Sequence, residues 1–282
     1  MSGAILSGSR RLRLRGSLSA AIRRFVLRGS GLRHNGTALL DYPEDHWYLV
    51  PFPAQKGQPY AADNLATVND CAFLQDPVFM AAHAAAASRW TLGARDIRWR
   101  LHTLLWAVET ALRTHPEGAL VELGTGNGYM AAGACRWLDW GADGLTSGRE
   151  FWLVDSFATD RPDEDGVTVP RRFYYADGDA DVREYFARFA GLHVVTGWLP
   201  EATAQISSST IAFVHVDLNH AESEIQALDA LVPRLLPGAL VLFDDSGNPG
   251  CGEQLIAHRA WAARLGTPFL QLPSGQGLCI IP

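Results

Sequence analysis

The stretch Ala119-Leu-Val-Glu-Leu-Gly-Thr-Gly-Asn-Gly128 decides the fold of this 282-residue chain. Three apolar residues lead to an acid, three glycines follow at alternate positions, and residues 129–138 are compatible with a helix. Glycine adopts backbone dihedrals that are closed to other residues and lets the backbone approach a ligand closely. The stretch therefore predicts a strand, a tight turn and a helix, which together are the first unit of a nucleotide-type binding fold.

The spacing of the glycines, together with Glu122, indicates which ligand the turn receives. Dinucleotide-binding turns have the spacing G-x-G-x-x-G and place a diphosphate at the helix N-terminus. Here Gly124, Gly126 and Gly128 give G-x-G-x-G, and Glu122 would repel a diphosphate. A carboxylate beside the turn suits a cationic ligand. S-adenosylmethionine fits this requirement, because it carries an ammonium and a sulfonium group and has no phosphate.

A second apolar run, Phe151-Trp-Leu-Val-Asp155, also ends in an acid. In this kind of fold an acid at the end of the second strand accepts hydrogen bonds from the diol of a ribose. Asp155 therefore predicts a nucleoside ligand, although it fits S-adenosylmethionine and NAD equally well. The alternative for both stretches is a pair of buried strands followed by loop acids that bind no ligand.

Two further apolar runs, Phe213-Val-His-Val-Asp217 and Leu240-Val-Leu-Phe-Asp244-Asp245, end in carboxylates. Because ligands in an open α/β sheet lie beyond the carboxyl ends of the strands, we expect these three aspartates at one edge of the crevice. Close carboxylates repel one another unless they are protonated or bridged by a cation. Oxygen ligands favour Mg²⁺, Mn²⁺ or Ca²⁺ over zinc, and such an ion lowers the pKa of a bound hydroxyl. The alternative is an acidic turn without a metal.

Two histidines lie close to these aspartates in the sequence. His220 follows Asp217 by three residues, and it is either a general base or a loop histidine without a role in the chemistry. His215 alternates with apolar residues inside an expected strand, so we expect it to be structural.

Composition and cysteine usage exclude several classes of protein. The hydrophobic content of 48% is enough for one sizeable core. The sequence contains no apolar run approaching the ~20 residues of a membrane span. The four cysteines are scattered and form no C-x-x-C pair, so neither a disulfide framework nor a zinc knuckle is expected. A reducing, cytoplasmic location is the expectation that follows.

Charge is unevenly distributed along the chain. Residues 1–40 contain eight arginines and no acid, whereas the remainder holds 16 basic residues against 30 acidic ones, a net charge of −14. An acidic body predicts no nucleic-acid binding. The basic segment is either an amphipathic arm for a membrane surface or a protein partner, an organellar transit peptide, or a solvated tail. Because it has no apolar stretch with a cleavage site, secretion is not expected.

Strands and helices alternate from residue 119 onward. Strands are expected at 119–122, 151–155, 193–196, 211–217, 239–243, 268–271 and 277–281, and helices at 76–90, 96–113, 129–138, 180–190, 221–235 and 250–264. This alternation predicts an α/β, Rossmann-like fold with a mostly parallel seven-stranded sheet. The connection between the last two strands is too short for a crossover, so they should form an antiparallel hairpin.

This pattern divides the chain into three parts. We expect a basic, disordered or amphipathic tail at 1–40, an accessory segment at 41–95 and a ligand-binding domain at 96–282. Within the domain, the segment 158–175 is long and rich in Asp, Arg and Pro. It is either a lid over the site or a surface loop without a gating role.

From about Asp96 to Pro282 the chain resembles the macrocin O-methyltransferase group of class I S-adenosylmethionine-dependent methyltransferases. The ordered motifs that carry the resemblance are Val121-Glu-Leu-Gly-Thr-Gly-Asn-Gly128, Val154-Asp-Ser-Phe157, Val182-Arg-Glu-Tyr-Phe-Ala-Arg-Phe189, Gly197-Trp-Leu-Pro-Glu201, Val216-Asp-Leu-Asn-His-Ala-Glu-Ser223, Leu236-Pro-Gly238, Phe243-Asp-Asp245 and Pro249-Gly-Cys-Gly-Glu-Gln254. The resemblance implies methylation of sugar hydroxyls in natural-product biosynthesis with Mg²⁺ held by three aspartates. By position these are Asp217, Asp244 and Asp245, and the first is also the implied proton acceptor.

The chain departs from this group at two places near the implied metal site. Asp217-Leu-Asn219 stands where the group usually has Asp-Gly-Asp, and Ser246 replaces the aromatic residue that usually follows the paired aspartates. The three implied metal ligands are retained despite these changes. The implied preference for a sugar acceptor is weakened by them.

The cofactor residues follow from the first two motifs and from the Gly197 motif. Glu122, the glycine turn, Asp155 and Ser156 would hold S-adenosylmethionine. Trp198 either packs on the adenine or lies in the core.

Three other functions remain open. One is a metal-independent methyltransferase with His220 as the base, and another is a non-catalytic scaffold that binds S-adenosylmethionine. The third, an NAD(P)-dependent oxidoreductase, is disfavoured by the glycine spacing and by the absence of a Tyr-x-x-x-Lys pair, since Lys56 is the only lysine. A homo-oligomer is compatible with the sequence.

Overall fold

The computed structural model describes residues 37–41, 47–51, 60–67, 69–89, 96–142, 144–157, 160–162, 168–170 and 178–282. The chain forms two compact units, Met1–Cys71 and Ala72–Pro282. The helix α2 (Pro77–Ala87) therefore belongs to the same unit as the sheet, rather than to a separate accessory segment.

Two antiparallel hairpins make up the described part of the first unit. The strand β1 (Thr37–Asp41) pairs with β2 (Trp47–Pro51), and β3 (Tyr60–Ala62) pairs with β4 (Leu65–Thr67). The β3–β4 hairpin turns at two residues with positive φ, 50° at Asp63 and 60° at Asn64. Short hairpins favour such a turn because its twist matches that of the flanking strands, and Asp and Asn tolerate the conformation.

Most of the basic tail and of the segment 158–175 lie outside the described residues. Within that segment, β7 (Asp160–Pro162) and β8 (Thr168–Pro170) pair antiparallel. A contact of the tail with a membrane or a protein partner, and a lid function of the segment, both stay predictions.

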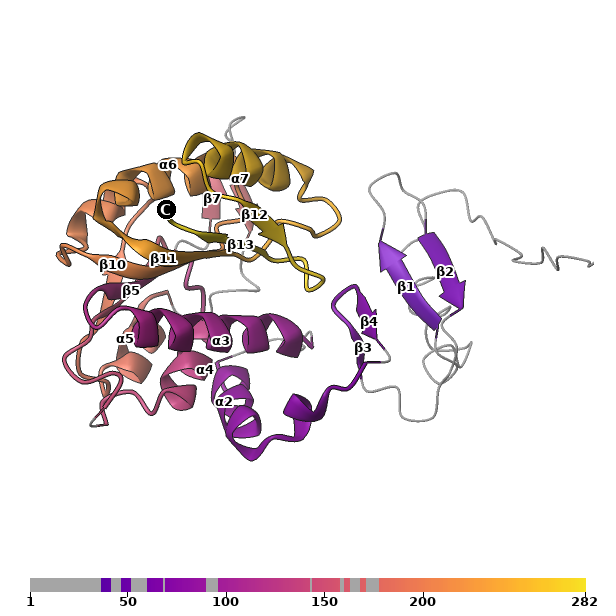
Figure 1. Ribbon diagram of the computed structural model, residues 1–282, viewed down its shortest axis with the longest axis horizontal. Coiled ribbons are helices and arrows are strands. Elements are labelled where there is room, and N and C mark those ends of the chain that lie inside the picture. The colour runs from indigo at the N-terminus through magenta and orange to yellow at the C-terminus, as the bar shows by residue number, and fades with distance from the viewer. Residues whose placement is uncertain are drawn as a thin grey trace, which may run out of the picture. The chain divides into compact units, whose positions relative to one another are not determined.

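A seven-stranded sheet is the centre of the second unit (Figure 1). Its strands are β5 (Ala119–Leu123), β6 (Phe151–Asp155), β9 (Leu192–Thr196), β10 (Ile211–Val216), β11 (Leu235–Phe243), β12 (Phe269–Gln271) and β13 (Gly277–Ile280). Their order in space is β12-β13-β11-β10-β5-β6-β9. The strands from β11 to β9 are parallel, whereas β13 runs antiparallel to both β11 and β12. The predicted mostly parallel sheet with a C-terminal antiparallel hairpin is confirmed.

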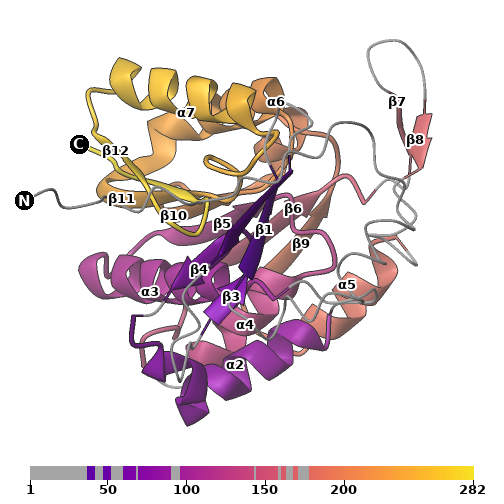
Figure 2. The same cartoon turned by 90° about the vertical axis from the view of Figure 1, so that its right-hand side faces the viewer.

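Helices cover both faces of this sheet (Figures 1 and 2). One face carries η1 (Ala72–Gln75), α2, α3 (Arg98–Thr114), α4 (Tyr129–Trp137) and α5 (Ala180–Phe186), and the other carries η2 (Glu201–Gln205), α6 (Ala221–Leu231), η3 (Val232–Arg234) and α7 (Gly252–Arg264). Each face has its own hydrophobic core. Among the described residues, no helix combines the length and hydropathy that crossing a bilayer requires.

Burial on both faces explains why the central strands are continuous apolar runs. In β5, Leu120 packs in the core under α3 and α4, whereas Val121 and Leu123 pack in the core under α6 and α7. A strand that is covered on both sides has no solvent-facing row, so polar residues do not alternate along it. Glu122 is the exception in this strand.

Local signals set several helix ends. The carboxylate of Asp76 accepts hydrogen bonds from the backbone N–H groups of Val78 and Phe79 at 2.8 and 2.9 Å, and Pro77 occupies the first position of α2. Both features are typical of a helix start. The helix α6 ends at Leu231, before the predicted residue 235, because Pro233 lacks the N–H that would continue the ladder.

The order of the strands reverses between β5 and β10, which is where ligands bind in sheets of this kind. Here the hydrogen-bonded ladder continues past the strand ends, since Asp217 N donates to Leu123 O at 2.8 Å and Asp244 N donates to Val216 O at 2.9 Å. The loop after β5 touches the loop after β10: a Cβ at Gly124 would lie 1.9 Å from the carbonyl oxygen of Asp217. The fold therefore brings the glycine turn against the first of the three aspartates.

We predict that Gly124→Ala destabilises the protein far more than Gly141→Ala. Both glycines have a similar φ, +90° and +92°, but a Cβ at Gly141 meets nothing within 4 Å. Gly141→Ala should cost only the left-handed backbone, about 1–2 kcal/mol. Gly124→Ala adds an overlap with backbone that cannot rotate away, so it should cost more than about 4 kcal/mol or abolish folding. Urea denaturation measures both, and equal losses would contradict the close approach.

Candidate active site

The glycine turn is shaped by the acid at the end of the neighbouring strand. Gly124, Gly126 and Gly128 all have positive φ, at 90°, 56° and 82°. The Asp155 carboxylate accepts a hydrogen bond from Gly126 N at 2.8 Å and another from Phe157 N at 2.8 Å. The sequence predicted a ribose-binding role for Asp155, and the structure adds that this carboxylate also holds the turn. Ser156, half-buried, follows directly after β6.

A second side chain supports the glycine turn from the segment just after α2, and sequence reasoning missed it. Arg89 is buried, and its Nε donates to the carbonyl oxygen of Asn127 at 3.0 Å. Its guanidinium also pairs with Asp181 of α5 and lies 4.3 Å from the centre of the Tyr185 ring. The turn is therefore tied to the segment that follows α2 and, through Arg89, to α5.

Glu122 does not extend from the turn into solvent. Its side chain is only 2% exposed, and its Oε1 lies 3.1 Å from Nδ1 of His215 on the adjacent strand β10. Burial raises the pKa of Glu122 above that of an ordinary carboxyl, although His215 acts in the opposite direction. Its contact with His215 is now established, whereas its role in holding the cofactor stays a prediction.

The three aspartates predicted at one sheet edge do come together. Asp217, Asp244 and Asp245, from here on the aspartate cluster, each offer a carboxylate oxygen, and these oxygens lie within 4.8 Å of one another. The last two side chains are buried and the first is half-buried. Asn219 donates to Asp217 Oδ1 at 3.1 Å, and Asn248 donates to Asp245. Loop amides therefore orient two of the three carboxylates.

A buried arginine on α3 reaches the aspartate cluster from the face of the sheet that α3 covers. Arg100 is 4% exposed, and its Nη1 lies 2.6 Å from Asp244 Oδ2 and 3.2 Å from Asp245 Oδ1. The carboxylate of Asp244 also accepts from Gln276 Nε2 at 3.2 Å. The sequence held one signal of this contact, because Arg100 falls on the same apolar stripe of α3 as Leu104.

These neighbours shift the pKa values of the three carboxyl groups in different directions. Burial, followed by the charges of Asp244 and Asp245, raises the pKa of Asp217 well above its ordinary value. Burial acts in the same direction on Asp244, but the charge of Arg100 and the proximity of His215 hold its pKa below the ordinary value. Burial and the charge of Asp244 raise the pKa of Asp245. Protons therefore bind more readily to Asp217 and Asp245 than to Asp244.

His215 is the second cation of this region. It is 1% exposed, and its Nε2 lies 3.7 Å from Asp244 Oδ1, which is an ion-pair distance but longer than a hydrogen bond. Burial lowers its pKa, yet Asp244 and Glu122 outweigh that effect and raise the pKa to about 10. The residue expected to be structural therefore joins Glu122 of β5 electrostatically to the aspartate cluster.

His220 occupies the N-cap position of α6. Its Nδ1 accepts a hydrogen bond from Ser223 N at 3.2 Å and lies 3.0 Å from the Ser223 hydroxyl. This nitrogen caps the first turn of the helix, as N-cap side chains commonly do. A role of His220 as a base would therefore fall to Nε2.

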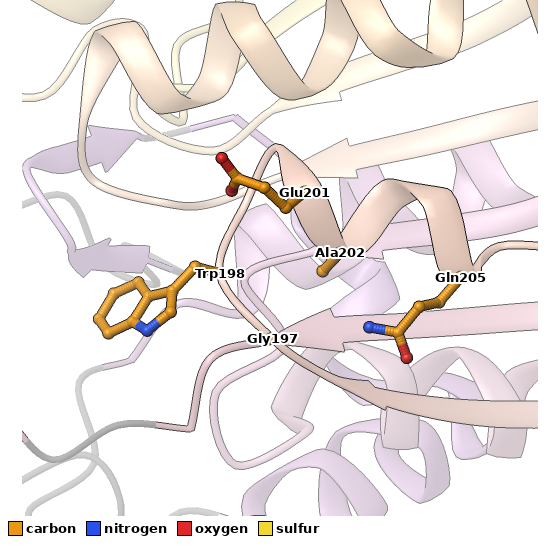
Figure 3. Close-up of a pocket in the computed structure, with 5 residues that line it drawn as sticks. All are labelled: Gly197, Trp198, Glu201, Ala202 and Gln205. Atoms are coloured by element: carbon orange, nitrogen blue, oxygen red, sulfur yellow. The ribbon is translucent and has the colours of Figure 1, made fainter.

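Trp198 lies beside an open hollow of about 480 Å³ at the end of β9 (Figure 3). The hollow is lined by Gly197, Trp198, Glu201, Ala202 and Gln205. Trp198 is 47% exposed, so a place in the core is excluded. An exposed indole at the carboxyl end of a parallel strand is free to stack on a planar ligand.

We predict that Arg100→Met destabilises the protein by about 3–5 kcal/mol, because it leaves buried carboxylates without their cation. Arg113→Met is the matched control, since Arg113 on the same helix forms a solvent-exposed ion pair with Glu109. The control should change stability by less than about 1 kcal/mol. Chemical denaturation in EDTA measures both, and a loss of similar size for the two variants would refute the structural role of Arg100.

Comparisons with known proteins show what this chain is similar to. Residues 121–246 match a family model described as a methyltransferase domain. A curated relative from Streptomyces olivaceus, 8-demethyl-8-(2,3-dimethoxy-alpha-L-rhamnosyl)-tetracenomycin-C 4'-O-methyltransferase, is 29% identical over 175 residues. That match covers 57% of this chain and 65% of the relative, so the chain spans slightly less than two thirds of the relative's length.

Two solved structures show the same fold. The O-methyltransferase NovP matches with a TM-score of 0.51 and 22% identity, over 64% of this chain and 78% of NovP. The calicheamicin methyltransferase CalS11 matches with a TM-score of 0.54 and 16% identity, over 80% of this chain and 99% of CalS11. Residues 121–246 are therefore similar to a methyltransferase domain, the curated relative is an O-methyltransferase, and the chain shares the fold of NovP and CalS11.

Proposed function

We propose that this protein transfers the methyl group of S-adenosylmethionine to a hydroxyl of a small molecule, with Mg²⁺ bound by the aspartate cluster. The observation that carries the proposal is the convergence of the three carboxylates at the strand ends next to the glycine turn. Because the loop carrying Gly124 touches the loop carrying Asp217, a cofactor on the turn and an acceptor on the cluster would be neighbours.

The charges around the cluster fit a divalent cation. Four carboxyl groups and two cationic side chains form the network, namely Glu122, Asp217, Asp244, Asp245, His215 and Arg100. With all six ionised, two negative charges remain uncompensated within it. A divalent ion would neutralise them, and a ligand set of carboxylate oxygens suits Mg²⁺.

The cofactor residues also fit their assignment. One carboxylate oxygen of Asp155 accepts a hydrogen bond from the glycine turn. Asp155 is also the last residue of β6, the position from which an acid reaches a ribose diol. Trp198, exposed at the end of the next strand, offers a flat surface for the adenine. Ser156 and Glu122 complete the proposed cofactor set. The cofactor supplies an electrophilic sulfonium methyl.

The residues of the cluster divide the work according to their environments. When bound, Mg²⁺ lowers the pKa of an acceptor hydroxyl and orients it. Asp217 is the carboxylate of the cluster that remains partly accessible, so it is placed to accept the proton of the acceptor hydroxyl. Arg100 keeps Asp244 ionised as a ligand. Rate then comes largely from holding the hydroxyl oxygen in line with the methyl group.

The acceptor is proposed to be a sugar or a glycosylated natural product. The curated relative is named for methylation of a rhamnosyl tetracenomycin. A solved structure of CalS11 is described as a TDP-rhamnose 3'-O-methyltransferase. We therefore favour a 6-deoxyhexose hydroxyl as the first acceptor class to examine.

A metal-independent methyltransferase is the second candidate, and Arg100 is the observation that favours it. The guanidinium already lies 2.6 Å from one carboxylate of the cluster, so the site holds a cation without a metal. In that case His220 would accept the proton through Nε2, and the aspartates would be structural.

We predict that Asp217→Asn abolishes metal-dependent methyl transfer and yet stabilises the metal-free protein at neutral pH. Folding raises the pKa of Asp217 above its value in the unfolded chain. The protein therefore loses stability as pH rises from the unfolded-state pKa to the folded-state pKa, because the buried carboxyl must ionise. An uncharged isostere removes that cost, and the gain should fade as pH falls toward the ordinary carboxyl pKa of about 3.9. Chemical denaturation in EDTA at several pH values measures this difference in stability between the variant and the wild type. The exposed Asp139→Asn should show no such gain, and a destabilised Asp217→Asn protein would contradict the electrostatics.

Calorimetric titration of S-adenosylmethionine and of NAD, with and without Mg²⁺, tests the cofactor and the metal together. We expect micromolar binding of S-adenosylmethionine, which corresponds to a binding free energy of about −8 kcal/mol, and no binding of NAD. Transfer of a methyl group to rhamnosylated aromatic acceptors, followed by mass spectrometry, should stop in EDTA and return with Mg²⁺. Full turnover in EDTA, lost in His220→Gln, would select the metal-independent mechanism instead.

A further inference from the structure

A buried chain of three polar side chains joins the two loops that carry the aspartate cluster. Glu224 of α6 lies with its Oε2 2.6 Å from His258 Nε2 on α7, and His258 Nδ1 lies 2.9 Å from Ser246 Oγ. The other oxygen of Glu224 accepts a hydrogen bond from Leu218 N at 3.3 Å. We refer to Glu224, His258 and Ser246 as the Glu–His–Ser chain.

The ends of this chain attach directly beside the metal ligands. Leu218 N belongs to the peptide that follows Asp217, and Ser246 follows Asp245. Through α6 and α7, the chain therefore connects the loop after β10 with the loop after β11. It does so from the sheet face opposite α3, the helix from which Arg100 reaches the cluster (Figure 1).

The Glu–His–Ser chain is tightly packed and closed to solvent. Glu224 and His258 are each 1% exposed and Ser246 is 0% exposed. The imidazole stacks on Phe243 with ring centres 4.1 Å apart, and a Cβ at Gly277 would lie 2.5 Å from Ser246 Oγ. A hydroxyl enclosed in this way reaches no substrate, so the order Ser–His–acid is not a nucleophilic triad here.

The hydrogen bonds of the chain define one consistent arrangement of protons. A carboxylate only accepts, so Nε2 of His258 is the donor to Glu224. In the neutral imidazole, Nδ1 then accepts from the hydroxyl of Ser246. Each polar atom of the three side chains thus has a partner, and a fully satisfied buried network holds its members in one geometry.

We propose that the Glu–His–Ser chain is a positioning device that holds the carboxylates of Asp217 and Asp245 at the separation required by one metal ion. The inference rests on the proposed metal-dependent function and extends it to residues that touch neither metal nor substrate. Partners outside the ligand shell orient metal ligands and commonly change metal affinity when they are removed.

The first test compares Ser246→Ala with Thr267→Val by titrating Mn²⁺ alone into the purified full-length protein. Ser246→Ala removes the hydroxyl at the end of the chain with little change in volume, and Mn²⁺ affinity should fall about ten- to a hundredfold. Thr267 is also buried and donates to the carbonyl oxygen of Ile280 at 2.5 Å, so its replacement removes an unrelated buried hydroxyl. Thr267→Val should bind Mn²⁺ as the wild type does, and equal affinities for all three proteins would overturn the proposal.

The second test separates hydrogen bonding from charge at Glu224. Glutamine keeps a carbonyl oxygen for Leu218 N and an amide nitrogen for the imidazole, which then carries its proton on Nδ1 and donates to Ser246. Leucine keeps neither group. We expect Glu224→Gln to bind Mn²⁺ nearly as the wild type does and Glu224→Leu to lose affinity as Ser246→Ala does. An equal loss in both variants would assign the effect to charge and overturn positioning.

The wild-type titration distinguishes failure of this inference from failure of the proposed function. If the wild type binds no Mn²⁺ and Asp217→Asn changes nothing, the metal-dependent function falls, and the inference falls with it. If the wild type binds Mn²⁺, Asp217→Asn abolishes binding and Ser246→Ala does not weaken it, only the role of the Glu–His–Ser chain is refuted. Thermal unfolding of each variant confirms that a folded protein is compared.

Discussion

The rest of this structure depends on one constraint. The carboxylates buried at the carboxyl edge of the sheet need positive charge beside them. Asp244 and Asp245 are buried where β11 ends, and an uncompensated buried charge costs several kcal/mol. Arg100 from α3 and His215 from β10 supply positive charge, and Gln276 supplies a hydrogen bond. The compensation is incomplete, because the carboxyl groups outnumber the cations, and this remainder supports the proposed binding of a divalent ion.

The aspartate cluster is held from both faces of the sheet by different chemistry. Ion pairs act from the α3 side, whereas the neutral and charged hydrogen bonds of the Glu–His–Ser chain act from the side of α6 and α7. The Glu–His–Ser chain also gives Ser246 a structural role, at a position where the methyltransferase group that the sequence resembles usually has an aromatic residue. With Gly277 and His258 packed against it, the space at this position holds a small hydroxyl side chain.

Much of the fold was predictable because its signals are local. Apolar runs buried on two faces gave the strands of the sheet, and the short connection before Gly277 predicted the antiparallel pair of β12 and β13. The aspartate cluster was predictable as well, since parallel strands bring their carboxyl ends to one edge. Helix ends were predicted less well, because helix propensity changes only gradually along a sequence. The helix α6 ends at Leu231, where Pro233 stops the hydrogen-bond ladder.

The sequence by itself therefore determined the class of fold, the glycine turn and the three acids that meet at one edge of the sheet. Only the tertiary structure decided which side chains support them. Arg100 meets Asp244 across 144 positions, Arg89 meets Asp181 across 92 and His258 meets Glu224 across 34. The physical reason is that strand and turn patterns repeat over a few residues, whereas partners of buried charges are chosen by packing between elements far apart in the chain.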